Sequence, residues 1–541
     1  MIRTRRTGAV NGFHALLLGG VVVLIVLGVM LARMGQPPSP PEPTVNGSNP
    51  DQSSSQGTTT NPAGAKGLFF YCAAGIRPAV EPVAKAYEKE FGVPIQLQFG
   101  GSNTLLNQVE VSKVGDLYLA ADASYIQLGR EKGVVEEGIP LALIRPVILV
   151  KQGNPKNIQS IEDLLREDVK TSLGNPDQAA VGRKTRKLLR QSGHWDKLEA
   201  HVTRTGVFHP TVPEVAVSVK LSADAGIVWD ATAPQYPDLE AVRVPELDAG
   251  TANITVGVLT SSEQPTQALR FARYLGARDK GLVIFQENGF ETLPGDKWAK
   301  TPEITFFCGA VNRRAVEKVV ARFEQREGCR VNTIYNGCGI LTAQMKVILG
   351  GDNPGQSFPD TYMACDRYYL ETVKEHFQED VDVSDTEVVI AVPKGNPLNI
   401  QSLQDLTKPN VRVTVGQPDQ CTIGVLTRKV LEQENVYDEV MANVKAQKPS
   451  SALLIPSVVL KTADATLAYR TDTIAESDKV DAIRIPSAAA KAIQPFSIAR
   501  SSDHKHLSRR FYQAVANART DFEAAGFHWR LRDSASRTDD Q

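Results

Sequence analysis

Two stretches of the chain repeat almost the same sequence. GNPDQAAVGRKTRKLL occupies residues 174–189, and GQPDQCTIGVLTRKVL occupies residues 416–431. The match extends outward, because the segment from Phe69 to Gly92 aligns without a gap with the segment from Thr305 to Gly328. Each repeated unit is roughly 230 residues long, far beyond the ~20–50 residues of a solenoid repeat. The chain is therefore predicted to contain two tandem copies of a whole domain, at residues 67–300 and 301–532.

The composition agrees with two ordinary folded domains. The chain has 541 residues, of which 42% are hydrophobic and 22% are charged, so each half can bury a sizeable core. The formal net charge is -1, so there is no overall basic field to attract nucleic acid. We therefore expect no nucleic-acid partner. Residues 533–541 are predicted to form a disordered tail.

The first 66 residues differ from the repeats. Residues 1–14 carry Arg3, Arg5 and Arg6, and residues 15–32 form an uncharged apolar run. As a helix this run would be ~27 Å long, enough to cross most of the hydrocarbon core of a bilayer. The preceding arginines predict a cytoplasmic N-terminus. We expect an uncleaved anchor in the inner membrane, and a cleaved signal peptide is the alternative.

Residues 33–66 are rich in Pro, Ser, Thr, Gly and Asn and contain almost no large apolar side chains. Such a segment buries too little apolar surface to fold, so it is predicted to be a disordered tether. With the anchor before it, the tether would hold both domains at the periplasmic or extracytoplasmic face of the membrane.

Each repeat begins with alternating strand and helix patterns. Residues 67–74 read as a buried strand, residues 77–92 as an amphipathic helix closed by glycine, and residues 94–100 as the next strand. This order is typical of a parallel α/β sheet, in which ligands bind beyond the carboxyl ends of the strands. The turn at 100–104 brings Ser102 to a helix start, where it can cap the helix and where free amides can bind an anion.

The repeated motifs resemble the molybdate-binding proteins of bacterial ABC importers. The resemblance rests on the strand-turn motif at 70–93, FGGSNTLLNQ at 99–108, GDLYLAADASYI at 115–126, GNPDQAAVG at 174–182 and DAGIVWDATA at 224–233. It implies an α/β fold of two tandem class II periplasmic-binding-protein units, each with two α/β lobes around a cleft. It also implies a small oxyanion ligand such as molybdate or tungstate, no cofactor, and an ABC importer permease as partner.

The resemblance further implies a ligand site in each unit. Members of this family hold an oxyanion with hydroxyl and backbone amide donors. In the first unit the corresponding residues are Gly75, Ser102, Val181, Thr211 and Trp229. In the second unit they are Val311, Cys338, Ile423, Ser451 (or its neighbour Ser450) and Tyr469. Glycine and valine replace the first ligand serine of the family, cysteine replaces the second serine in one unit, and tryptophan replaces a tyrosine in the other.

Arg77 and Arg313 follow the first turn of each unit. Each can add a charge-assisted hydrogen bond to an anion, or can be an ordinary arginine on a helix surface. The sequence does not separate these alternatives.

Cysteine is concentrated in the second unit, where Cys338, Cys365 and Cys421 fall at or beside predicted cleft turns. Three interpretations of this candidate thiol cluster are open. The cysteines can form a structural disulfide, gather around a soft metal ion or thiophilic ligand, or simply pack as small apolar side chains. An alternative function for the second unit is therefore a thiol-based metal-binding or redox module.

Enzymatic chemistry is not indicated. The chain has no P-loop, HExxH or G-x-S-x-G pattern. Aspartates at the strand ends are expected to cap helices and to make lobe contacts, because no nucleophile accompanies them. The sequence therefore predicts a solute-binding protein, with an extracytoplasmic sensory or scaffolding protein as a further alternative.

Overall fold

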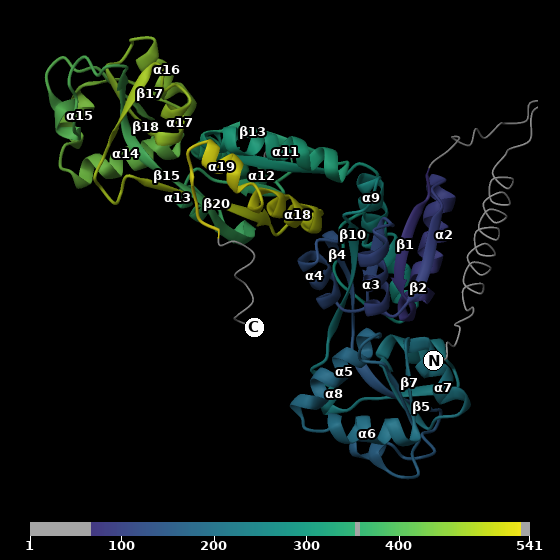
Figure 1. Ribbon diagram of the computed structural model, residues 1–541. Helices are drawn as coiled ribbons and strands as arrows, with labels where there is room; N and C mark the ends of the chain where they lie inside the picture. The colour runs from purple at the N-terminus through teal and green to yellow at the C-terminus, as the bar shows by residue number, and fades with distance from the viewer. Residues whose placement is uncertain (1–65, 352–356, 532–541) are drawn as a thin grey trace, which may run out of the picture. The chain divides into compact units, whose positions relative to one another are not determined.

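The computed structural model describes residues 66–351 and 357–531 (Figure 1). The basic stub at 1–14, the predicted anchor at 15–32, nearly all of the predicted tether and the tail at 533–541 lie outside the described residues. No helix within the described ranges has the length and apolar character needed to span a bilayer.

The first repeat forms two α/β lobes, here called lobe A and lobe B. Lobe A has a six-stranded sheet in the order β11-β4-β10-β3-β1-β2. Its elements are β1 (Leu68–Ala73), η1 (Ala74–Ile76), α2 (Arg77–Phe91), β2 (Ile95–Gly100), α3 (Ser102–Ser112), β3 (Leu117–Ala120), α4 (Ser124–Glu131), β4 (Val135–Ile144), β10 (Ala252–Leu259), α9 (Pro265–Leu275), α10 (Gly281–Glu287) and β11 (Glu291–Thr292).

Lobe B has a five-stranded sheet in the order β7-β6-β8-β5-β9, with α5, α6 and α7 around its strands (Figure 1). Its elements are β5 (Pro146–Lys151), η2 (Glu162–Leu165), β6 (Thr171–Gly174), α5 (Ala180–Gln191), α6 (Trp195–Thr205), β7 (Val207–His209), α7 (Val212–Leu221), β8 (Ala225–Trp229), η3 (Asp230–Gln235), β9 (Leu239–Val242) and α8 (Pro245–Asp248).

The second repeat has the same two lobes. Its lobe A contains β12 (Glu303–Gly309), η4 (Ala310–Asn312), α11 (Arg313–Glu327), β13 (Arg330–Asn336), α12 (Cys338–Leu349), β14 (Thr361–Met363), α13 (Arg367–Glu371), η5 (Lys374–His376), β20 (Lys491–Ala499), α18 (Lys505–Ala516), α19 (Arg519–Ala524) and β21 (His528–Trp529). Its lobe B contains η6 (Leu403–Thr407), β16 (Val413–Gly416), α14 (Thr422–Gln433), α15 (Tyr437–Ala442), β17 (Val444–Lys448), η7 (Ser451–Leu453), α16 (Leu454–Val459), β18 (Ala465–Tyr469), α17 (Arg470–Ile474) and β19 (Val480–Arg484). Strand β15 (Phe377–Pro393) runs through both lobes.

The predicted strand-helix-strand start of each domain is confirmed. In the first domain β1 pairs in parallel with β2 and β3, and α2 ends at Gly92, whose φ of 70° is left-handed and suits glycine. The parallel pairing predicted for this start does not extend through the whole sheet, because β10 returns antiparallel to β3 and β4. The hydrophobic pattern of a buried strand does not encode its direction.

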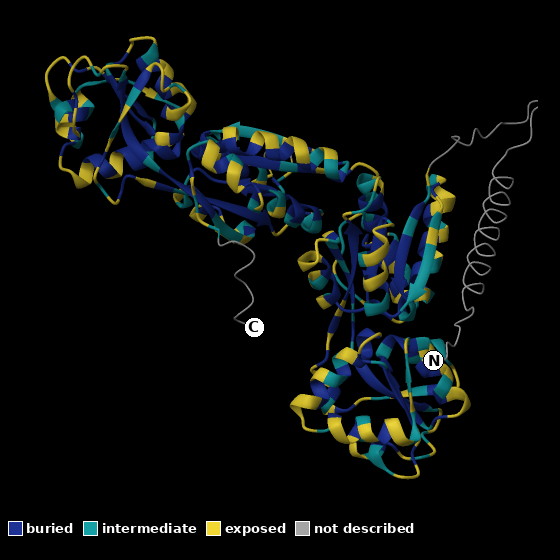
Figure 2. Ribbon diagram, viewed as in Figure 1, coloured by how far each residue is buried: buried dark blue, intermediate teal, exposed yellow. Residues whose placement is uncertain are grey.

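The apolar side chains form two large cores. One contains buried residues from Leu68 to Phe290, and the other contains buried residues from Ile304 to Phe527. Figure 2 shows the strands largely buried, while the helices expose their outer faces. This is the arrangement expected when amphipathic helices cover a sheet.

The two domains differ where the chain first passes between the lobes. In the first domain β4 and β5 are separated by Arg145, and Pro146 lies opposite Trp229 on β8. In the second domain β15 is continuous at this point: Glu387 pairs with Lys491 in lobe A, and the next residue, Val388, pairs with Tyr469 in lobe B. The residue at the end of β8 or β18 therefore lies opposite the lobe boundary.

Candidate functional site

Turns from the two lobes meet closely in the first domain. A Cβ atom on Gly101, just before α3, would lie 2.4 Å from the carbonyl oxygen of Gln178 and 2.6 Å from that of Pro210. Only glycine fits this close approach. A Cβ atom on Gly75 would make an ordinary contact, 3.4 Å from Cβ of Val212 at the start of α7. The turns that contain the predicted ligand residues are therefore brought together at the boundary between lobes A and B.

Polar contacts join the same turns. The backbone amide of Asn103 donates to the Gln178 carbonyl at 3.1 Å, and its side-chain amide donates to the Asp177 carbonyl at 2.7 Å. Lys184 Nζ of lobe B lies 2.7 Å from Asp122 Oδ2 of lobe A. Burial raises the pKa of the Asp122 carboxyl, but hydrogen bonds from Lys184 and the Ser124 amide outweigh burial and leave the pKa below its ordinary value. The lobes are thus held closed on each other.

Ser102 is not the helix cap that the sequence predicts. Gly101 is the N-cap of α3, without a side-chain cap bond, and Ser102 is the first helical residue. The Ser102 hydroxyl is buried and accepts a 3.3 Å hydrogen bond from the Ala121 amide. A side-chain cap is found on a different helix of the lobe contact, α7, where Thr211 forms a capping box with Glu214.

The remaining predicted residues lie at helix starts and strand ends. Val181 and Ile423 are the second residues of α5 and α14, where backbone amides have no carbonyl partner within the helix. Trp229 and Tyr469 are the last residues of β8 and β18, and both are buried. These positions allow amides and aromatic side chains to face the lobe boundary from lobe B.

The second domain repeats the close approach. A Cβ atom on Gly337 would lie 2.4 Å from the Gln420 carbonyl oxygen and 2.5 Å from the Pro449 carbonyl oxygen. The Tyr369 hydroxyl donates to the Pro418 carbonyl at 2.5 Å. The short helices that contain Val311 and Ser451, η4 and η7, also pack together. The same turns therefore meet in both domains.

Arg77 and Arg313 lie on the helix surface. Arg77 Nε lies 3.0 Å from Glu81 Oε2, and its guanidinium stacks over Phe99 at 4.9 Å. Arg313 likewise pairs with a glutamate one turn later, at 3.3 Å, and stacks over Tyr335 at 5.2 Å. The structure gives both guanidinium groups partners other than a ligand.

Two of the three candidate cysteines form a close pair. Cys338 Sγ and Cys365 Sγ lie 3.0 Å apart, and the Cys365 amide donates to Cys338 Sγ at 3.1 Å. Burial raises the pKa of the Cys338 thiol, but its contacts with Cys365, Tyr362 and Thr422 outweigh burial and leave this pKa lowered. The pKa of Cys365 is raised well above its ordinary value by the contact with Cys338 and by burial. We call Cys338 and Cys365 the thiol pair.

Cys421 does not join this pair as predicted. Its thiol donates to the carbonyl oxygens of Gln417 and Lys448, at 3.5 and 3.4 Å. All six cysteines are free thiols. Within the described ranges, no three His, Cys, Asp or Glu side chains are placed to hold a metal ion.

Unpaired hydroxyls surround the thiol pair. The hydroxyls of Tyr362, Thr422 and Tyr469 are buried and have no hydrogen-bond partner in the described part of the chain. Tyr362 and Thr422 lie beside the Cys338 thiol, and Tyr469 lies near both sulfurs. In the first domain the residue equivalent to Tyr362, Tyr118, donates its hydroxyl to the Ser102 carbonyl at 2.7 Å. Sequence reasoning missed Tyr362 and Thr422, although aligning the two repeats places them beside Cys365 and Cys421.

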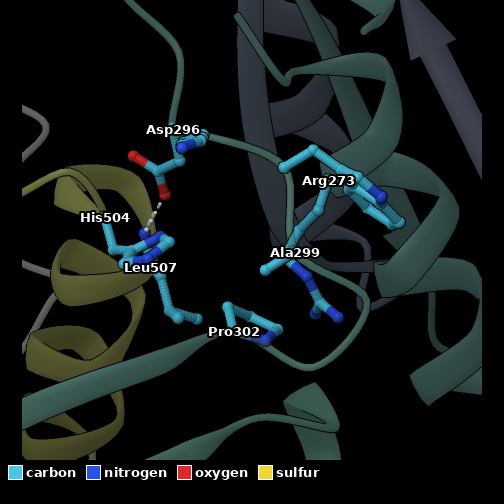
Figure 3. Close-up of a pocket in the computed structure, with 8 residues that line it drawn as sticks. Arg273, Asp296, Ala299, Pro302, His504 and Leu507 are labelled. Atoms are coloured by element: carbon cyan, nitrogen blue, oxygen red, sulfur yellow. Dashed lines mark hydrogen bonds between the residues drawn. The ribbon is translucent and has the colours of Figure 1, made fainter. Parts of the chain in front are cut away.

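Cavities in the described part of the chain include one outside these turns and one against them. One, of about 20 Å³, lies beside the segment that connects the domains. Figure 3 shows Asp296 at this cavity accepting a hydrogen bond from the Leu507 amide, and Asp296 also accepts one from the His506 amide. This cavity has room for about one water molecule and is too small for a solute. The other, of about 340 Å³, opens beside the lobe contact of the second domain and is lined in part by Tyr369 and Arg428.

The strand-end aspartates hold backbone in both domains. Asp116 accepts from the Phe69 amide at 2.9 Å, and its equivalent Asp360 accepts from the Thr305 amide at 2.8 Å. These bonds tie neighbouring strands together, so Asp116 and Asp360 neither cap a helix nor join the lobes as the sequence predicts.

Comparison with known proteins identifies the repeat. The family described as bacterial extracellular solute-binding protein matches residues 68–291 and again residues 304–528. The molybdate-binding protein ModA of Mycobacterium tuberculosis is 24% identical over 243 residues, 44% of this chain and 88% of that protein. ModA of Escherichia coli is 24% identical over 231 residues, 41% of this chain and 88% of that protein. The solved periplasmic molybdate-binding protein of Azotobacter vinelandii has 17% identity and a TM-score of 0.36, covering 41% of this chain and 98% of that one.

Proposed function

Since the chain belongs to the bacterial extracellular solute-binding protein family, we propose that it captures a small oxyanion, such as molybdate or tungstate, for an ABC importer. Relatives named as molybdate-binding proteins match at 24% identity, which supports this ligand class. Members of the family are binding proteins, and the proposed role is accordingly capture and delivery without catalysis.

The observation that carries the proposal is the meeting of equivalent turns in both domains. In the first domain the turn before α3 contacts the turns before α5 and α7 through Gly101. Helix N-termini present partly positive amides that favour an anion. The Ser102 hydroxyl lies next to this contact and is buried. An oxyanion held here would exchange its hydration shell for amide and hydroxyl donors.

The position of the predicted anchor completes the proposal. Residues 15–32 would hold the chain at the inner membrane, and both domains would face the extracytoplasmic side, where an importer permease receives ligand. Opening and closing of the lobes would load and release the ligand.

The first cleft is tested with Ser102→Ala in the full chain. Molybdate, tungstate, sulfate and phosphate are titrated by calorimetry into the wild type and the variant. Removing one hydroxyl donor to an anion costs roughly 1.5–3 kcal/mol, so affinity at the first cleft should fall about 10- to 100-fold. Ser112→Ala, at the other end of α3, is the matched control and should bind like the wild type. Unchanged affinity in S102A would mean that this hydroxyl only holds the Ala121 amide.

A further inference from the structure

The thiol pair in the second domain is a built feature and not a chance contact. Both cysteines are buried, with relative exposures of 0% for Cys338 and 4% for Cys365. A Cβ atom on Gly309 would lie 2.3 Å from Cys365 Sγ and 2.8 Å from Cys338 Sγ. The absence of a side chain at Gly309 therefore provides the room that two sulfur atoms need.

The first domain shows what these positions hold without the thiols. At the end of β1, Ala73 of the first domain aligns with Gly309 of the second. At the helix start, Ser102 aligns with Cys338, and just after β3, Ala121 aligns with Cys365. The hydrogen bond from the strand-end amide to the helix-start side chain is kept in both, at 3.3 Å to Ser102 Oγ and 3.1 Å to Cys338 Sγ. Three positions thus change together around one preserved backbone geometry.

The thiol pair also has polar neighbours without partners. The hydroxyls of Tyr362, Thr422 and Tyr469 come from both lobes. Tyr362 and Thr422 lie beside the Cys338 sulfur, and none of the three hydroxyls has another hydrogen-bond partner in the described part of the chain. A buried hydroxyl without a hydrogen bond is destabilising. A ligand with its own hydroxyl groups would satisfy these hydroxyls. Arg313, the cation nearest in sequence to the first turn, already pairs with Glu317. These neighbours therefore suit an uncharged ligand better than a dianion.

We propose that the second cleft binds a trivalent metalloid hydroxide, such as arsenous acid, through Cys338 and Cys365. This inference rests on the proposed function, since it names a different ligand class for the second copy of the same cleft. Two sulfur–metalloid bonds form and two metalloid–hydroxyl bonds break. Each thiol proton leaves with a released hydroxyl group, giving two water molecules. The metalloid stays trivalent and keeps its third hydroxyl, which Tyr362, Thr422 or Tyr469 can bind.

The two sulfurs lie closer together than tetrahedral zinc would hold them. Tetrahedral zinc holds two thiolates about 3.8 Å apart, because each bond is about 2.3 Å long. The observed separation is 3.0 Å. A pyramidal trivalent centre has bond angles closer to a right angle and holds its two sulfurs closer together than tetrahedral zinc does. A zinc site built on thiolates also needs further protein ligands. The third cysteine of this cleft, Cys421, is not one of them, because its thiol is hydrogen-bonded to backbone carbonyls.

The test uses the full chain, reduced with a phosphine and titrated with arsenite. Native mass spectrometry should find one arsenic atom per chain, and alkylation mapping should find Cys338 and Cys365 protected. Cys338→Ser and Cys365→Ala each introduce the residue of the first domain, and each should abolish uptake. Cys421→Ser is the matched control and should keep full uptake. Tyr469→Phe should keep the stoichiometry and weaken binding several-fold, which loss of a thiol would not do.

Three results would overturn the inference. The first is absence of arsenic uptake by the reduced wild type. The second is equal loss of uptake in C421S and C338S. The third is recovery of Cys338 and Cys365 only as a disulfide that the phosphine does not reduce. Circular dichroism of C338S and C365A checks that both variants fold. Molybdate binding in the same samples separates the two hypotheses. If molybdate binds in an S102A-sensitive manner while arsenite fails, only this inference is wrong.

Discussion

Replacing Gly309 with alanine should destabilise the second domain. The new Cβ atom would lie 2.3 Å from Cys365 Sγ, 2.8 Å from Cys338 Sγ and 2.8 Å from the Cys365 amide nitrogen. The first two neighbours are short buried side chains and the third is backbone, so none can move away freely. Overpacking of this kind costs about 1–3 kcal/mol, and three simultaneous contacts place G309A near the upper end. The smaller entropy of the unfolded alanine chain offsets less than about 1 kcal/mol of this cost.

For a domain of this size, a loss of about 2–3 kcal/mol lowers the melting temperature by roughly 4–12 °C. Hydrogen exchange during denaturant titration measures the effect, because peptides from the second domain should lose protection while those from the first domain do not. Gly75→Ala is the control, since its Cβ atom would lie at an ordinary 3.4 Å from Val212.

A combined variant tests the cause of the destabilisation. Adding Cys338→Ser and Cys365→Ala to Gly309→Ala recreates the arrangement of the first domain and removes both sulfur atoms that the new methyl group meets. Stability should therefore recover to within about 1 kcal/mol of the double cysteine variant, because the three positions are in contact and their effects are not additive. A stable G309A, or a triple variant as unstable as G309A, would refute the packing argument.

Three further predictions concern other parts of the chain. Glu327 is buried between Arg510, at 2.5 Å, and Arg273, at 2.9 Å, so Glu327→Gln should cost about 3–5 kcal/mol in urea unfolding; a loss below about 1 kcal/mol would contradict this ion-pair network. Burial raises the pKa of the Asp472 carboxyl to about 7. This is above the unfolded value, so native stability falls as pH rises from about 4 to about 7. Asp472→Asn should therefore add on the order of 4 kcal/mol at pH 8 and nothing at pH 4, and equal gains at both would count against it. Residues 15–32 should keep the chain with membranes on fractionation, whereas a chain recovered in the soluble extracytoplasmic fraction and starting after Met34 would favour signal cleavage.

The duplication and the strand-helix order of each domain could be predicted because both produce patterns that are visible in short stretches of sequence. The repeat is visible as identical spacing, and the strand and helix of residues 68–91 follow from buried runs and amphipathic periodicity. The direction of β10 could not be predicted, because a buried strand reads the same in either direction.

The sequence predicted which turns form the candidate site, but it did not predict in which direction their side chains point. The sequence identified the turn of Ser102, but packing of Gly101 against two carbonyl groups sets the helix start and turns the hydroxyl toward Ala121. Cys421 likewise occupies a cleft turn, while its thiol faces carbonyls of its own lobe. The sequence around Gly309 does not by itself indicate that this glycine makes room for the thiol pair. Its meaning appears only when it is compared with Ala73 in the other repeat and with the sulfurs it accommodates.

The crossing between the lobes gives the two domains different mechanical properties. Val388 has a backbone amide that donates to the Ala490 carbonyl at 2.9 Å, at the point where β15 passes from one lobe to the other. The equivalent residue in the first domain is Pro146, which has no amide to donate. A rotation about this point must break a hydrogen bond in the second domain and none at the same residue in the first. We therefore expect the first cleft to open and close more often than the second. In the second domain, the Val388 amide should exchange slowly with solvent.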